Sequence, residues 1–287
     1  MTRKMLMNAL FPLAAAALAG SWSFAVLAQQ ASAPPPDIPQ LMKDVQAHQK
    51  EVDKERENDT YTALLTTQDI DANGHVTKTE TEEDENFFVN GHLIYRKVKK
   101  NGQPLNSHED QKETERVTKL VEKAQNTPSD KPLEGEPVSI SRLLEIMEVR
   151  NPRRETYRGR PTIVFDFIGR RDAKTHGMIE DASKRLQGTV CIDEADRQVA
   201  HLDVSFNDNF RVAGGVFATV QKGSNFHFDQ APVGNGVWLP TGGEGAMSAR
   251  LLMVKGVRQH YTERDYDFKR FSVDAQQSKE AKPVNAK

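Results

Sequence analysis

The sequence predicts a mainly β protein of the α+β class, built on one large curved antiparallel sheet, an incomplete β-barrel, with a few covering helices. From Thr60 onward, short runs of alternating apolar and polar residues follow one another. Three Asn-Gly pairs, at 73–74, 90–91 and 101–102, separate such runs and supply the positive φ angles of tight hairpins. Strand and helix patterns do not alternate along the chain, which disfavours a parallel sheet.

The first 28 residues are typical of a secretory signal peptide. Arg3 and Lys4 precede the apolar run ALFPLAAAALAG, and small residues at the cleavage spacing end the segment at Ala28. We therefore expect a mature chain that begins at Gln29 and is soluble, in the periplasm or outside the cell. Gln29 is not the cysteine that lipid anchoring requires, and no later stretch is apolar enough to span a membrane.

The predicted layout after the signal peptide has three parts. Residues 29–37 form a flexible Pro-rich leader, residues 38–273 form a single domain, and residues 274–287 form a disordered tail. Loss of residues 1–28 removes two basic and no acidic residues, so the net charge changes from −2 to about −4. This mildly acidic balance disfavours nucleic acid as a partner.

Three segments are predicted to be helical because apolar residues recur at helical spacing: 38–56, 107–125 and 139–148. Asp37 can cap the first helix, and Ser107 with Asp110 resembles a capping box at the start of the second. Three helices can cover one face of a long sheet and still leave part of its interior unfilled. Farther along the chain, GGEG at 242–245 is predicted to be a turn that precedes a strand at 249–261.

The segment 188–206, GTVCIDEADRQVAHLDVSF, is predicted to be a hairpin in which Asp193 pairs with Arg197. This register makes Cys191 and His201 diagonal neighbours, which a thiol nucleophile could use. The same alternation is typical of a solvated strand face, which is the favoured interpretation. No catalytic residue is therefore predicted, and the protein is not expected to be an enzyme. The histidine spacing indicates no zinc site.

The segment 69–80, DIDANGHVTKTE, fits the calcium-loop pattern of an EF-hand. Its ligands would include Asp69, Asp71, Asn73, Thr77 and Glu80. The flanking residues favour strands rather than the helices of an EF-hand, so a hairpin turn is the favoured interpretation and calcium the alternative. No metal and no cofactor are predicted.

The order of these features resembles the outer-membrane lipoprotein-sorting superfamily of periplasmic carriers, from about Pro39 to Phe271. The segments that carry the resemblance are VNGHLIYRKVKKNGQPLN, QGTVCIDEADRQVAHLDVSF and VWLPTGGEGAMSARLLMVKG. The resemblance implies an incomplete β-barrel whose apolar concave side is covered by helices and can hold acyl chains. The receptor branch of that family is itself a lipoprotein, and this chain lacks the cysteine for that. No functional residue is carried over.

Apolar residues alternate along several strands and define candidate inner faces. As a ligand wall they would comprise Phe165, Phe167, Leu202, Val204, Phe206, Phe226, Phe228 and Trp238. The alternative is packed core beneath the helices. The sequence thus predicts a carrier for lipid, lipoprotein acyl chains or another apolar ligand. The alternative is a non-enzymatic envelope interaction or sensor module of the same fold, with an envelope protein as partner.

Overall fold

The computed structural model describes residues 37–129, 131–133, 136, 138–233, 236–252 and 254–270. The predicted signal peptide, most of the leader and the C-terminal tail lie outside the described residues. Within this part of the chain, no helix is long and apolar enough to cross a bilayer.

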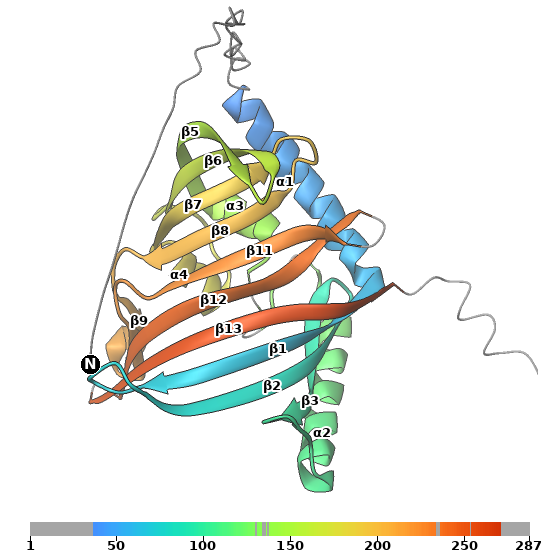
Figure 1. Cartoon of the computed structure of the whole chain (residues 1–287), viewed down its shortest axis with the longest axis vertical. Coiled ribbons are helices and arrows are strands. Elements are labelled where there is room, and N and C mark those ends of the chain that lie inside the picture. The colour runs from blue at the N-terminus through green and yellow to red at the C-terminus, as the bar shows by residue number, and fades with distance from the viewer. Residues whose placement is uncertain are drawn as a thin grey trace, which may run out of the picture. The chain divides into compact units, whose positions relative to one another are not determined.

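One antiparallel sheet of thirteen strands dominates the described part of the chain (Figure 1). Along the main path the order is β4-β3-β2-β1-β13-β12-β11-β8-β7-β6-β5, and β10 pairs with β12 and β9. The strands are β1 Asp59–Ile70, β2 Val76–Val89, β3 His92–Lys100, β4 Gln103–Pro104, β5 Met147–Tyr157, β6 Arg160–Gly169, β7 Leu186–Asp193, β8 Val199–Phe206, β9 Phe210–Val212, β10 Ala218–Val220, β11 Asn225–Val233, β12 Val237–Leu251 and β13 Lys255–Arg270. The sheet is open, with β4 and β5 at its edges, which confirms the predicted fold class.

The helices described in the structure are α1 Ile38–Glu55, α2 Ser107–Gln125, α3 Ile140–Ile146 and α4 Gly177–Ser183. The Asp37 side chain accepts a hydrogen bond from Gln40 N at 3.3 Å, so the predicted cap of α1 is confirmed. The predicted capping box of α2 is wrong by one residue. Its cap is Asn106, whose side chain accepts from Glu109 N while Glu109 accepts from Asn106 N. Asparagine is as favourable as serine at the N-cap position. A glutamate three residues later is long enough to accept a hydrogen bond from the N-cap backbone N–H, whereas an aspartate is too short.

The β2–β3 and β3–β4 turns use the predicted Asn-Gly pairs. Asn90 and Gly91 have φ of 51° and 81°, and Asn101 and Gly102 have φ of 50° and 74°. Both residues of each pair lie in the left-handed region, as the twist of a two-residue hairpin requires.

The β7–β8 hairpin forms, but its predicted register is wrong by two residues over most of its length. Cys191 pairs directly with His201, not diagonally, and Val190 pairs with Leu202. The register shifts between Cys191 and Ile192, where Ile192 pairs with Val199. This irregularity turns Val199 into the apolar core, whereas the predicted register placed it on the polar face.

The predictions for the last two long strands need correction. GGEG at 242–245 lies inside β12, and the predicted strand 249–261 is divided by the β12–β13 turn. A Cβ at Gly242 would lie 2.4 Å from Glu263 O, and Gly242 has a φ of 143°. Glycine here permits the close approach of β13 and a bulge against β11, rather than a chain reversal.

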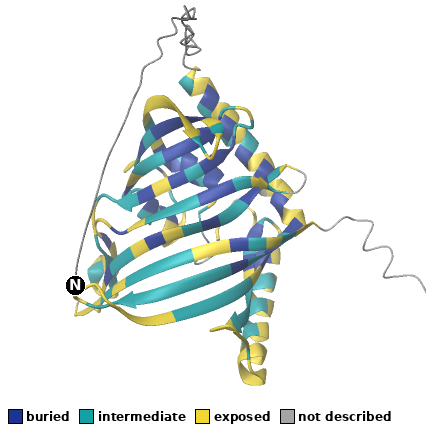
Figure 2. Ribbon diagram, in the orientation of Figure 1, coloured by how far each residue is buried: buried dark blue, intermediate teal, exposed yellow. Residues whose placement is uncertain are grey.

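Two apolar clusters pack between the sheet and the helices. The larger lies beneath α1 and α3 and joins them to β6, β7 and β8. The smaller joins Ile94 of β3 to α2 and Leu133. Burial in Figure 2 is concentrated in the strands next to α1 and α3, while β1 and β2 are mostly half-buried and β13 is half-buried or exposed at nearly every position.

Candidate functional site

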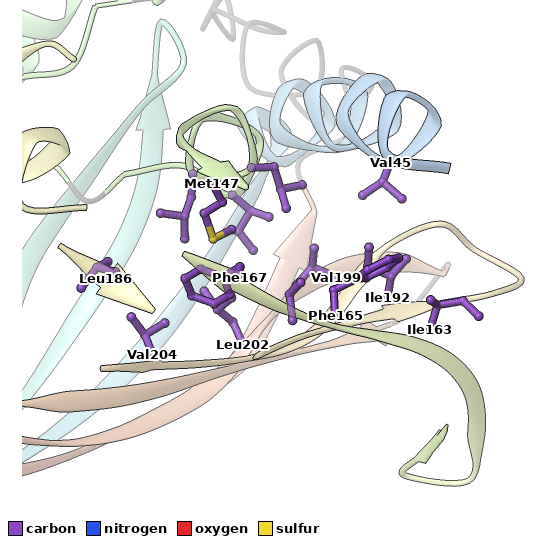
Figure 3. Close-up of a cluster of buried hydrophobic side chains, with 14 of the residues drawn as sticks. Val45, Met147, Ile163, Phe165, Phe167, Leu186, Ile192, Val199, Leu202 and Val204 are labelled. Atoms are coloured by element: carbon purple, nitrogen blue, oxygen red, sulfur yellow. The ribbon is translucent and has the colours of Figure 1, made fainter. Parts of the chain in front are cut away.

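Seven of the eight residues predicted as a ligand wall come together at the larger apolar cluster. Phe165, Phe167, Leu202 and Val204 belong to it and are at most 4% exposed. Phe206, Phe226 and Phe228 are half-buried and pack against it. Figure 3 shows this cluster between the sheet below and helices above, with Val45 of α1 and Met147 facing the strands. This inner face is the candidate site for an apolar ligand.

Trp238, the eighth residue, has polar surroundings. Its indole Nε1 donates a hydrogen bond to Asp196 at 3.1 Å, and the Arg160 guanidinium lies 5.6 Å from its ring centroid. Its carbonyl oxygen accepts from Arg56 Nε at 3.1 Å. Trp238 is 3% exposed, so it fixes the segment that follows α1 against β12.

Polar contacts hold α1 over the cluster. Gln49 donates a hydrogen bond to the Gln198 side chain, and both residues are fully buried. Lys50 forms an ion pair of 2.7 Å with Glu145 of α3. This pair joins the helix to the β7–β8 turn, and its separation would leave further buried amide groups without a partner. The helix is therefore fixed at its middle and at its C-terminal end.

The same face of the sheet changes character in β13, β1 and β2. Phe228 pairs with Gly243, and Gly243 pairs with Glu263, so Glu263 and Asp265 continue the core-facing side into β13. Asp265 and Asp84 both pair with Ala63 of β1. This half of the inner face is consequently acidic, whereas the strand alternation and the family resemblance predicted an apolar inner face.

Burial raises the pKa values of Asp265 and Asp84. Burial, reinforced by the Glu263 carboxylate, raises the pKa of Asp265 to about 8. Burial, reinforced by Glu82, raises the pKa of Asp84 to about 6. The sequence YTERDYDF indicates this acidic face, because Glu263 and Asp265 occupy alternate strand positions and therefore share one face.

A polar cluster on the opposite face joins three strands. His201 Nδ1 lies 2.7 Å from Asp229 Oδ1, and the Tyr157 hydroxyl donates to the same oxygen at 2.5 Å. The Tyr157 and His201 rings stack at 4.8 Å. Burial lowers the pKa of His201, but the hydrogen bonds of Asp229 and Asp203 outweigh it and raise the pKa overall. The cluster fastens the end of β5 over β8 and β11, a contact that the sequence pattern did not reveal.

Cys191, the candidate nucleophile, is buried beside His201. Burial, with the nearby carboxylates of Glu155 and Asp203, raises the pKa of its thiol to about 11. A thiol nucleophile needs a lowered pKa. The thiol is therefore neutral near pH 7, and this geometry supports no thiolate chemistry.

The segment 69–80 is a hairpin turn, the favoured interpretation. Asp71 Oδ1 accepts from Asn73 N at 2.8 Å and from His75 N at 2.9 Å, and Gly74 has a φ of 88°. Glu80 lies within β2, where it pairs with Thr67 and its carboxylate contacts Lys78 at 2.8 Å. In an EF-hand these residues would surround one calcium ion, but here they are distributed along the paired strands β1 and β2 and the turn between them. Across the described residues, no three His, Cys, Asp or Glu side chains form a group that could hold a metal ion.

A cavity of about 360 Å³ opens at the end of the sheet where β9 and β10 join β12. Its lining is polar and basic: Asn209, Arg211, Thr219, Gln221, Lys222 and Arg250. Thr219 pairs with Arg211 on one side and with Arg250 on the other, so the three side chains share a face. No local sequence pattern indicates this group of residues, because their proximity depends on the pairing of β9 and β10.

Comparisons with known proteins give structural likenesses only. No family model and no curated protein matches the chain. Among solved structures, the chain is similar to a DUF1329 family protein from Desulfovibrio piger, with 9% identity over 80% of this chain and 92% of that chain and a TM-score of 0.38. It is also similar to an outer membrane lipoprotein-sorting protein domain from Vibrio parahaemolyticus, with 10% identity over 83% of this chain and 98% of that chain and a TM-score of 0.35.

A third similar structure is MucB in complex with MucA(peri), with 9% identity over 81% of this chain and all of that chain and a TM-score of 0.22. All three TM-scores are low, so the functional proposals below are based on the contacts and burial of this chain itself.

Proposed function

We propose that this protein is an exported, non-enzymatic carrier that binds a lipid, a lipoprotein acyl chain or another apolar ligand on the inner face of its sheet. The observation that carries the proposal is the larger apolar cluster on an open sheet, where residues of α1 and α3 pack against the strands. An acyl chain needs apolar contact and few hydrogen bonds, which fits a wall of aromatic and branched side chains.

Ligand entry requires that a helix move, because the central side chains are already buried. Phe165 is fully buried and Phe167 is 4% exposed. The half-buried ring of Phe226 lies at the margin of the cluster, toward the acidic half of the face. We propose that the ligand enters along this margin and displaces α3, which has seven residues, rather than the longer α1. An acyl chain would gain about 25 cal/mol for each Å² of apolar surface buried.

The second candidate is an interaction or sensor module of the same fold. The complete burial of Phe165, Val190 and Ile192 favours it, because a filled core leaves the outer surfaces to make contacts. The two functions differ in one measurable respect, namely whether an apolar ligand enters the cluster.

The test is the binding of a fluorescent fatty-acid analogue to the exported protein, with hydrogen exchange of α3 followed in parallel. The carrier proposal expects micromolar binding, displacement by unlabelled lipid and altered exchange in residues 140–146. Phe226→Glu should weaken binding at least about tenfold, since a charge would have to be desolvated at the margin. Ile179→Glu on α4 is the matched control, because Ile179 is exposed and outside the cluster. A folded protein that leaves the probe free in solution contradicts the carrier proposal and favours the interaction module.

A further inference from the structure

The segment before β10 meets the β12–β13 turn at one corner of the sheet, near β9 in Figure 1. The large apolar side chains of these two segments form an exposed patch. We call it the apolar corner; it comprises Val216, Phe217, Leu251, Leu252 and Val254. Phe217 is 62% exposed, Leu252 64% and Val254 84%. Leu252 N donates to Phe217 O at 3.0 Å, so the two segments are held together. Large apolar side chains grouped at this exposure mark a surface that binds something.

The backbone at Leu252 strengthens this inference. Leu252 has a φ of 46°, a left-handed conformation that glycine or asparagine adopts at less cost than leucine. A branched apolar residue therefore occupies a turn position where it is both strained and exposed. Neither packing nor turn geometry accounts for its presence, which points to a role outside the fold.

Cations flank the apolar corner. Leu251 of the corner pairs with Ala218 across the β10–β12 ladder. The next residues along the two strands, Arg250 and Thr219, belong to the cavity lining. The basic cavity lined by Arg211, Lys222 and Arg250 therefore adjoins the corner, and Lys255 follows it as an exposed residue. Among the described residues, Arg211, Lys222 and Arg250 form no ion pair with an acidic side chain.

This combination selects one kind of occupant. Apolar side chains at turns can enter the boundary between headgroups and acyl chains of a bilayer, and cations beside them contact lipid phosphates. Three positively charged side chains line the cavity. Such a lining favours the oxygens of a phosphate group over an apolar peptide. The corner lies at an end of the strands, where the sheet can touch a flat surface without unfolding.

We infer that the apolar corner and its basic cavity form a docking surface for anionic membranes. Phe217, Leu252 and Val254 insert among the headgroups, while Arg211, Lys222 and Arg250 bind phosphate groups. This inference stands on residues separate from the larger apolar cluster, so it holds or fails independently of the carrier proposal.

The first experiment measures sedimentation of the exported protein with vesicles of phosphatidylglycerol and phosphatidylcholine, or of phosphatidylcholine alone. We expect binding to the mixed vesicles that falls with salt. Arg211→Gln with Arg250→Gln should lower the partition coefficient about twenty-five-fold, at about fivefold for each cation. Phe217→Ser with Leu252→Asn should lower it at least about tenfold, and Asn suits the left-handed backbone. Comparison between variants removes any contribution of the N-terminal segment.

Matched control variants make the same kinds of substitution at exposed sites outside the apolar corner. The controls for charge are Lys112→Gln with Lys119→Gln on α2, and the controls for apolar surface are Met178→Ser with Ile179→Ser on α4. These exposed residues are far from the corner in sequence, so both double variants should leave the partition coefficient unchanged. A second measurement uses tryptophan emission. Phe217→Trp should shift to the blue on anionic vesicles, and Met178→Trp should not. Equal binding by all variants, or binding to an acidic protein but not to anionic vesicles, overturns the inference.

Discussion

Asp265 is a residue whose protonation the fold controls. It is 7% exposed, and burial next to Glu263 raises its pKa from 3.8 to about 8. The native state therefore holds a proton that the unfolded chain releases as the pH rises above 3.8. Its contribution to stability is present at low pH and is lost as the pH rises through about 8. Asp84, with a pKa raised to about 6, acts in the same direction at lower pH.

We expect the melting temperature to fall as the pH is raised from about 4 to about 8, and Asp265→Asn to reduce this fall. The neutral amide keeps the shape of the protonated acid but has no proton to lose. Asp267→Asn is the control, since Asp267 is exposed two positions along the same strand. Calorimetry across the pH range gives the measurement. An unchanged slope in the Asp265→Asn variant would refute the assignment.

At the scale of elements, most helices and strands could be predicted, because their signals are local. The helix at 38–56 and the hairpins at the Asn-Gly pairs depend on residues a few positions apart. What could not be predicted depends on contacts between distant strands. The shift at Ile192 and the glycine-rich interior of β12 exist because β6, β11 and β13 approach there. The candidate site was likewise predictable only in its apolar members.

The capping box of α2 gives a prediction for that helix. Asn106→Ala should destabilise the protein by about 1 kcal/mol, because two backbone N–H groups of the first turn lose their acceptor. Ser107→Ala should change the unfolding free energy little, since Ser107 lies after the cap. Urea unfolding of both variants decides between the two positions. A larger loss for Ser107→Ala would contradict the observed cap.

The β1–β2 turn gives a second prediction at this scale. Asp71→Ala should lower the melting temperature by a similar amount in calcium and in a chelator, because Asp71 serves the backbone of the turn. Glu80→Ala should have a small effect in both conditions, since Glu80 lies on the strand beside Lys78. Stabilisation of the parent protein by millimolar calcium, abolished in both variants, would restore the calcium interpretation.

For the whole molecule, the layout predicted from the sequence leads to a test of export. We expect the protein recovered from expressing cells to begin at Gln29, because the charged start, apolar run and small residues end at Ala28. N-terminal sequencing or intact mass gives the answer directly. A chain that retains Met1, or that carries an acyl group, would contradict both the predicted cleavage and the predicted compartment.

The open sheet has a further consequence, because an unclosed sheet has two rows of free backbone groups. One edge, β4, has only two residues, Gln103 and Pro104, and proline offers no N–H. The other, β5, contains Pro152 within a shift of its pairing between Arg150 and Arg153. Both borders are therefore poor templates for adding a strand from a second copy. At these two borders the sheet can stay open without the polymerisation that exposed strands otherwise invite.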